Sequence, residues 1–228
     1  MCDKAQDERN KIVRKKMLDI RDVEIVPMPN DSPWLRPVRI NFLQDGRPKA
    51  WDLMRSHESV STLMFNTTRK RLVFVRQFRP AAYYANLPEK QGPVDTEKYP
   101  PESALTLELC AGIVDKDIPL IEIARGELRE ECGYEVPASA FTQIITYRNV
   151  SATAARHTMF YAEVTDAMHV HPGKYQSEGE LIEVVEMSVQ EARDYIKSDE
   201  VPSPPGFIFG ILWFLTNKTQ HCSCEKSR

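Results

Sequence analysis

The sequence predicts an α+β fold with one main domain, and three features of the 228-residue chain support this prediction. Segments that alternate between apolar and polar residues predict strands, and two pairs of them are joined by short turns into hairpins. Other segments repeat their apolar residues with the period of a helix. Strands and helices do not alternate regularly along the chain, which favours a mixed sheet flanked by helices over repeated βαβ units.

The N-terminal region begins with charged residues and continues with strand patterns. Residues 1–20 can form a helix, because Val13, Met17 and Ile20 fall near one face, or they can remain an arm. Residues 36–42 and 49–54 alternate on either side of a turn at 44–47, which predicts an N-terminal β-hairpin.

The remaining elements follow in chain order. Strands are predicted at residues 59–66, 71–79, 106–111, 141–147, 158–164 and 180–187, and helices at 119–132, 189–197 and 206–216. Residues 86–102 contain several prolines and predict a long loop, and such loops are commonly functional or disordered. We expect a charged N-terminal arm at 1–22, one domain at 23–217 and a polar tail at 218–228.

The composition excludes several classes of protein. The chain is 42% hydrophobic and 28% charged, as in ordinary soluble proteins. Its net charge is −3, whereas nucleic-acid-binding proteins usually carry an excess of basic residues. No apolar run reaches the roughly 18–20 residues of a membrane span, and the N-terminus resembles neither a secretory signal nor a transit peptide. We therefore expect a cytoplasmic protein that binds neither nucleic acid nor membrane.

The predicted helix at 119–132 carries three carboxylates close together. At about 100° per residue, Glu127, Glu130 and Glu131 span about 100° beside the apolar stripe of the helix. Like charges three or four residues apart cost roughly 0.2–0.5 kcal/mol per pair, and the C-terminal end of the helix dipole disfavours anions further. A hard divalent cation would offset this repulsion. A solvated acidic face explains the same residues, so the helix alone leaves both interpretations open.

The surrounding sequence resembles the box of the Nudix hydrolases, G-x5-E-x7-R-E-U-x-E-E-x-G-U, in which U is apolar. The resemblance lies in the stretch Glu108-Leu109-Cys110-Ala111-Gly112 followed by Glu127-Leu128-Arg129-Glu130-Glu131-Cys132-Gly133-Tyr134, with no gap in the spacing. Ile118 replaces the first glutamate of the box and Gly126 replaces its arginine. The resemblance implies a Nudix-type α/β/α sandwich with a mixed β-sheet, here with an added N-terminal β-hairpin region. It also implies a hydrolase that uses Mg²⁺, with Mn²⁺ as an alternative.

Further segments resemble the ADP-ribose and nucleotide-sugar pyrophosphatase branch, and within it the UDP-sugar pyrophosphatases of animals. They lie at residues 32–37, 51–54, 75–83, 158–161, 178–185 and 207–210, and the similarity spans about residues 31–217. This resemblance implies hydrolysis of UDP-sugars such as UDP-glucose to UMP and a sugar 1-phosphate. Two alternatives remain: hydrolysis of ADP-ribose to AMP and ribose 5-phosphate, and a nucleotide-binding module without catalysis. Ile118 and Gly126 favour the module, whereas the three glutamates of the box and Glu180 oppose it.

The resemblance also implies roles for the acidic residues and the backbone between them. Glu127, Glu130 and Glu131 are the expected metal ligands, together with the backbone carbonyl of Ala111. Glu180 matches the position of the base that accepts the proton of the attacking water. Glu178 is the alternative base, and both could instead be loop acids in water.

Four further residues are candidates for substrate binding. Arg79 is expected to contact the diphosphate because its planar guanidinium suits phosphate oxygens, and Arg76 is a weaker candidate. Arg156 could reach a phosphate or the sugar, and Trp51 could stack on the base or pack as an ordinary strand residue. The branch further implies a homodimer in which the N-terminal strands at 23–57 contribute to the partner's site.

Overall fold

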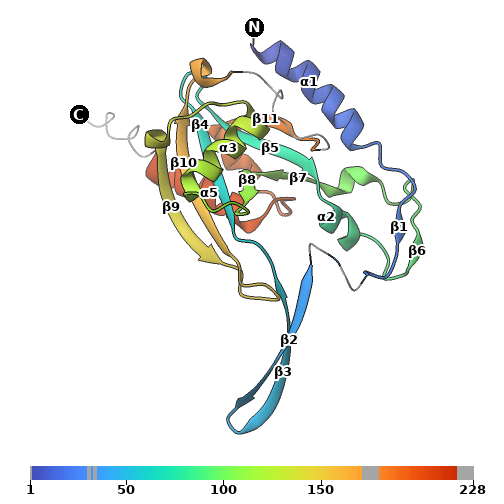
Figure 1. Cartoon of the computed structure of the whole chain (residues 1–228). Helices are drawn as coiled ribbons and strands as arrows, with labels where there is room; N and C mark the ends of the chain where they lie inside the picture. Colours follow the sequence, from blue (N-terminus) through green and yellow to red (C-terminus); the bar gives the residue numbers. More distant parts are fainter. Residues whose placement is uncertain (1, 30–31, 33–34, 171–179, 220–228) are drawn as a thin grey trace.

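The computed structural model describes residues 2–29, 32, 35–170 and 180–219. They form a mixed sheet with helices on both faces (Figure 1), which confirms the predicted α+β sandwich. The helices are α1 Cys2–Met17, α2 Pro80–Ala85, α3 Leu120–Cys132, α4 Val189–Tyr195 and α5 Pro205–Asn217, with 3₁₀ turns η1 Pro101–Ala104, η2 Ala138–Ala140 and η3 Asp166–Met168. The strands are β1 Glu24–Ile25, β2 Arg36–Gln44, β3 Arg47–Arg55, β4 Ser59–Asn66, β5 Arg71–Phe78, β6 Gly92–Pro93, β7 Leu105–Glu108, β8 Cys110–Ile113, β9 Phe141–Arg148, β10 Arg156–Val164 and β11 Glu183–Ser188.

Within the described residues the main sheet has seven strands. Its order is β11-β5-β4-β10-β9, with β7 added beside β5 and β8 beside β4. Strand β10 runs parallel to β4, whereas the other pairs are antiparallel. Strand β11 therefore lies at one end of the sheet, with β5 on one side of it.

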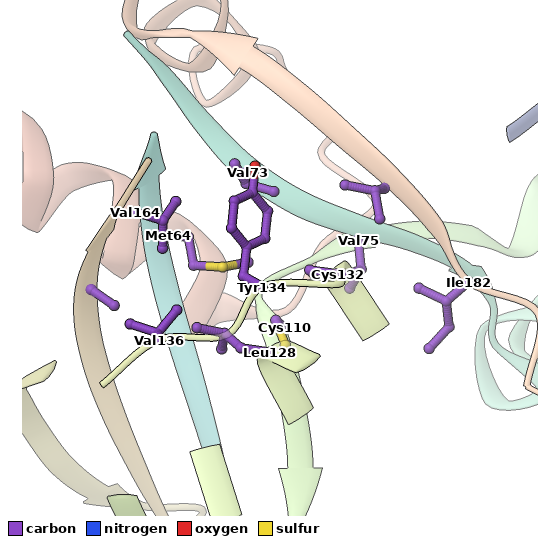
Figure 2. Close-up of a cluster of buried hydrophobic side chains, with 12 residues drawn as sticks. Met64, Val73, Val75, Cys110, Leu128, Cys132, Tyr134, Val136, Val164 and Ile182 are labelled. Carbon is purple, nitrogen blue, oxygen red and sulfur yellow. The ribbon is translucent and has the colours of Figure 1, made fainter. Parts of the chain in front are cut away.

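The two faces of the sheet bury separate apolar clusters. Val73 and Val75 of β5 pack toward α3, together with Leu128 and Cys132 of that helix (Figure 2). Leu72 and Phe74 point to the opposite face, where they join a cluster that includes residues of α4 and α5. The period-two alternation of β5 thus serves both layers, as the sequence predicts.

Helix α3 begins and ends close to its predicted limits. Its last turn is closed by Gly133, which has a φ of 76° and donates its N–H to the carbonyl of Arg129. The next N–H, of Tyr134, bonds to the carbonyl of Leu128. This left-handed cap suits glycine because a side chain would be strained there. The chain direction then changes sharply after Cys132, and the acidic last turns of α3 stay against the sheet.

The segment predicted as one strand at 106–111 is two strands. Strands β4 and β5 pair directly only near their turn, at residues 64–66 and 71–73, and then separate. β7 pairs with β5 and β8 pairs with β4. The strand is therefore interrupted at Leu109, where the chain crosses from β5 to β4. The short helix α2 was not predicted, although Pro80 at its first turn is typical of a helix start.

The N-terminal residues are ordered against the domain. Of the two structures that the sequence allows for residues 1–20, the helix is the one formed, and Val13 and Met17 of α1 are buried. The predicted hairpin is confirmed as β2 and β3, which extend away from the sheet (Figure 1). None of the described helices combines the length and apolar character needed to span a membrane.

Candidate active site

Glu131 lies at the junction of α3 and β8. It is 5% exposed, and its Oε2 accepts the backbone N–H of Ala111 at 3.1 Å. Burial, together with the charges of Glu127 and Glu180, raises the pKa of this carboxyl to about 8, although hydrogen bonds from Cys110 and Ala111 oppose the shift. A carboxylate that is costly to ionise in a buried place is typical of a functional site.

Glu127 lies one turn earlier on α3 and contacts the backbone of Gly112. A Cβ atom at Gly112 would lie 2.0 Å from Oε1 of Glu127, so only glycine allows this approach. Burial raises the pKa of Glu127 to about 7, and the charges of Glu130 and Glu180 contribute. Helix α3 and strand β8 therefore hold two carboxylates with raised pKa values beside the backbone of residues 111–112.

Glu180 lies close enough to these two carboxylates for its charge to act on them. It precedes β11, whose first residue is Glu183, and it is exposed. Its charge acts on both Glu127 and Glu131. Four described carboxylates, including the exposed Glu130, thus come from α3 and from the start of β11 to one location.

Arg79 supplies positive charge at this location. Its guanidinium forms two hydrogen bonds with Glu108, of 2.7 and 2.6 Å, and Oγ1 of Thr106 donates to the same carboxylate at 2.6 Å. The hydrogen bond with Glu108 is the main cause of the raised pKa of Arg79, and the charges of Glu131 and Glu180 also raise it. Burial alone would raise the pKa of Glu108, but Arg79 outweighs it and the pKa is lowered. Arg79 is therefore held charged and oriented at the edge of the acidic group.

The donor set fits a hard divalent cation. In the part of the chain that the structure describes, no three histidine, cysteine, aspartate or glutamate side chains are grouped tightly enough to form a complete metal site. Glu127 and Glu131 are nevertheless oxygen donors with raised pKa values, and the charge of Glu127 adds to the cost of ionising Glu131. A bound cation would stabilise both charged forms, since an opposite charge favours ionisation of a carboxyl.

Other predicted site residues have contacts away from the glutamates of α3 or are exposed. Arg76 contacts Glu183 at 3.4 Å and lies in a groove with α1. Arg156 forms two hydrogen bonds with Glu58 at the surface, of 2.8 and 2.9 Å. Trp51 is 61% exposed on the extended hairpin. Glu178 lies outside the described residues.

Two acidic residues without a predicted role have defined contacts near the site. Glu108 orients Arg79, and the buried Glu183 pairs with Arg14 and Arg76. Each is a carboxylate beside apolar strand residues that the sequence predicts to be buried, which is the signal that could have identified it.

The two departures from the box have open surroundings, Ile118 just before α3 and Gly126 within it. Ile118 is 45% exposed, and a Cβ at Gly126 would have no neighbour within 4 Å. On the same side Arg125 bonds to Glu122 at 2.6 Å and to the carbonyl of Val136 at 2.8 Å. The bond to Val136 joins α3 to the segment that follows it, beside Gly126.

Comparisons with known proteins identify clear relatives. The chain is 40% identical over 208 residues to the uridine diphosphate glucose pyrophosphatase NUDT14 of Mus musculus, with 85% of this chain and 94% of the relative covered. The corresponding protein of Bos taurus is 42% identical over 199 residues, covering 81% and 90%. A GDP-mannose pyrophosphatase of Escherichia coli (strain K12) is 32% identical over 139 residues, covering 61% of this chain and 64% of the relative.

Structural comparison gives the fold independently. A crystal structure of an ADP compounds hydrolase matches with a TM-score of 0.59 and 12% identity, covering 88% of this chain and 97% of that one. At 12% identity the match supports the fold and no statement about function. No family model matches the chain.

Proposed function

Because this chain belongs to the Nudix hydrolases, in their nucleotide-sugar pyrophosphatase branch, we propose that it hydrolyses the diphosphate bond of UDP-sugars. UDP-glucose would give UMP and glucose 1-phosphate. One observation carries the proposal. Carboxylates of α3 with raised pKa values lie beside the backbone of Ala111 and Gly112, and the charge of Glu180, just before β11, acts on them. Arg79 stands at their edge as a cation suited to phosphate.

The proposed metal ligands are carboxylates on α3 and one backbone oxygen. Glu127 and Glu131 would hold Mg²⁺, or Mn²⁺ in its place, with Glu130 and the carbonyl of Ala111 completing the set. When bound, the cation would neutralise charge on the phosphoryl oxygens. The raised pKa values of Glu127 and Glu131 support this assignment, because the two side chains are costly to ionise without a nearby positive charge.

The proposed reaction is the attack of water on one phosphorus of the diphosphate. The water oxygen forms a bond to phosphorus, the bridging P–O bond breaks, and its electron pair leaves with the other phosphate. Glu180 accepts the proton of the water, with Glu178 as the alternative base. Arg79 binds the phosphate oxygens and stabilises charge that moves toward the leaving group.

The proposed assembly is a homodimer formed through the hairpin of β2 and β3. Val38 pairs across it with Leu53 and Ile40 with Trp51, so these apolar side chains share one face. Val38 and Ile40 are each 47% exposed within one chain. A two-stranded hairpin is marginal alone in water, and an exposed apolar face of this kind is typical of an interface.

The same assembly gives Trp51 and Arg156 a role. The extended hairpin of one protomer would carry the exposed Trp51 to the partner's substrate base. Arg156 lies at the start of β10, and its partner Glu58 follows the root of the hairpin. Arg156 would bind the sugar or a phosphate there, and Arg76 remains a weaker candidate.

The cytoplasmic location stays a proposal as well. Cys110 and Cys132 are buried free thiols within the described residues. Thiols that stay reduced are usual in the cytoplasm, where disulfides are rare.

A substrate panel tests the proposed function. Purified protein with Mg²⁺ is given UDP-glucose, GDP-mannose and ADP-ribose, and UMP and sugar 1-phosphate are measured by ³¹P NMR. We expect the highest kcat/KM for UDP-glucose. Faster turnover of ADP-ribose would overturn the substrate assignment. If no nucleotide sugar is hydrolysed with either metal while UDP-glucose raises the Tm, the chain is a binding module instead.

A further inference from the structure

Helix α1 lies along the end of the sheet, beside β11 (Figure 1). Val13 and Met17 bury their side chains there, at 8% and 2% exposure. The side-chain amide of Asn10 donates to the carbonyl of Val184 at 2.7 Å. Because β11 pairs with β5 on one side, α1 occupies its other edge, and a covered edge cannot pair with another chain.

Arg14 joins this helix to the first residue of β11. Its Nε donates to Oε2 of Glu183 at 3.0 Å, and its terminal nitrogen donates to Oε1. Arg76 of β5 contacts the same carboxylate from the sheet, at 3.4 Å. Glu183 is 4% exposed, and a buried carboxylate that loses its cation is strongly destabilising. Arg14 thereby fixes the backbone where β11 begins.

Glu180 lies three residues before this anchored position. Ile182, between them, is buried in the apolar cluster that packs against α3 (Figure 2). The segment is therefore held by Ile182 in the core and by Glu183 at α1. Glu180 itself is exposed, and its charge reaches Glu127 and Glu131. The location of Glu180 therefore depends on the anchor at Glu183 rather than on packing of its own side chain.

We infer that Arg14 is a positioning residue for the reaction: through Glu183 it sets the start of β11 and so places Glu180 against the glutamates of α3. This inference rests on the proposed function. It adds a role for the N-terminal helix, which lies outside the part of the chain that resembles the pyrophosphatase branch.

The test compares three variants of the full chain with UDP-glucose as substrate. Arg14→Ala is expected to lower kcat roughly tenfold with KM changed less than about twofold, because small misplacements of a catalytic group are costly. Arg14→Lys is expected to restore part of kcat, since lysine supplies the charge without the two-pronged geometry. Lys11→Ala is the control, because Lys11 is on the same helix and pairs with Glu8 at the surface.

Two further measurements separate positioning from stability alone. In a Glu180→Gln background, Arg14→Ala is expected to cause little additional loss of kcat, because both changes then act on one interaction. Hydrogen exchange of the backbone at residues 183–185 is expected to accelerate in Arg14→Ala and not in Lys11→Ala.

The outcomes are distinguishable from failure of the proposed function. A wild-type chain inactive on every nucleotide sugar counts against the proposed function. Wild-type kcat in Arg14→Ala, or a full multiplicative loss in the double variant, overturns the positioning role. Unchanged exchange at 183–185 overturns the anchoring itself, whether or not the chain is active.

Discussion

Replacing Glu131 with glutamine should stabilise the metal-free protein while abolishing its response to magnesium. The pKa of Glu131 rises from the ordinary 4.5 to about 8 in the fold, chiefly through burial. At about 1.4 kcal/mol per pH unit, keeping this carboxyl protonated at pH 7 costs roughly 3 kcal/mol of folding free energy. Glutamine avoids this cost, and its amide oxygen can still accept the N–H of Ala111.

The sign of the pH dependence follows from the same shift. Between about pH 4.5 and pH 8 the folded metal-free protein binds more protons at Glu131 than the unfolded chain does. Its free energy of unfolding therefore falls as the pH rises through this window. Glu131→Gln should have a flatter dependence there, and its Tm in EDTA at pH 7 should rise by up to about 6–12 °C.

Thermal unfolding followed by circular dichroism, in EDTA and in excess Mg²⁺, measures these effects. Magnesium should raise the Tm of the wild type by mass action and leave that of Glu131→Gln nearly unchanged. Glu122→Gln is the matched control, because its partly exposed ion pair with Arg125 is worth at most about 1 kcal/mol. A lower Tm for Glu131→Gln in EDTA, or an equal gain from magnesium in both proteins, would refute the reasoning.

Three other predictions concern the proposed base Glu180, the ion pair of Arg79 with Glu108, and the hairpin of β2 and β3. Glu180→Gln should lower kcat by roughly 10²–10⁴ with an unchanged Tm, and near wild-type turnover would move the base to Glu178. Glu108→Gln should release Arg79, lowering kcat/KM about tenfold and unfolding stability by about 1–3 kcal/mol in urea titrations. Because the pKa of Glu108 is lowered in the fold, this stability difference should be full above its ordinary pKa of 4.5 and be lost as the pH falls from there through the lowered pKa of the folded state. A constant difference would contradict the ion pair. Ile40→Asp should yield a monomer in sedimentation experiments, and a persistent dimer would place the interface elsewhere.

The sequence predicts best those features that depend on residues close together in the chain. The acidic face of α3 follows from spacing along one helix, and Glu131 lies where the apolar stripe meets that face. The hairpins follow from alternation around short turns, and both appear in the structure. The crossing at Leu109 depends on where β4 and β5 separate, which no local pattern encodes.

The location of the arginines is the part that sequence could not supply. Strand alternation can assign Arg76 to a face, but only the pairing of β5 with β11, which sets Arg76 opposite Glu183, explains the contact between them. The helical spacing of residues 1–20 likewise left a helix and an arm equally open. The buried carboxylate of Glu183, which binds Arg14, distinguishes them, and it lies 169 positions away in the chain.

The split strand at Leu109 links completion of the fold to assembly of the candidate site. β7 can pair only after β5 is in place, and β8 only after β4, so this segment joins the sheet late relative to the local hairpin of β4 and β5. The same segment carries Glu108 on one side of the break and Gly112 on the other. A chain in which this segment has not yet joined the sheet therefore lacks both the partner of Arg79 and the backbone that Glu127 contacts, so the candidate site forms only when the sheet is complete.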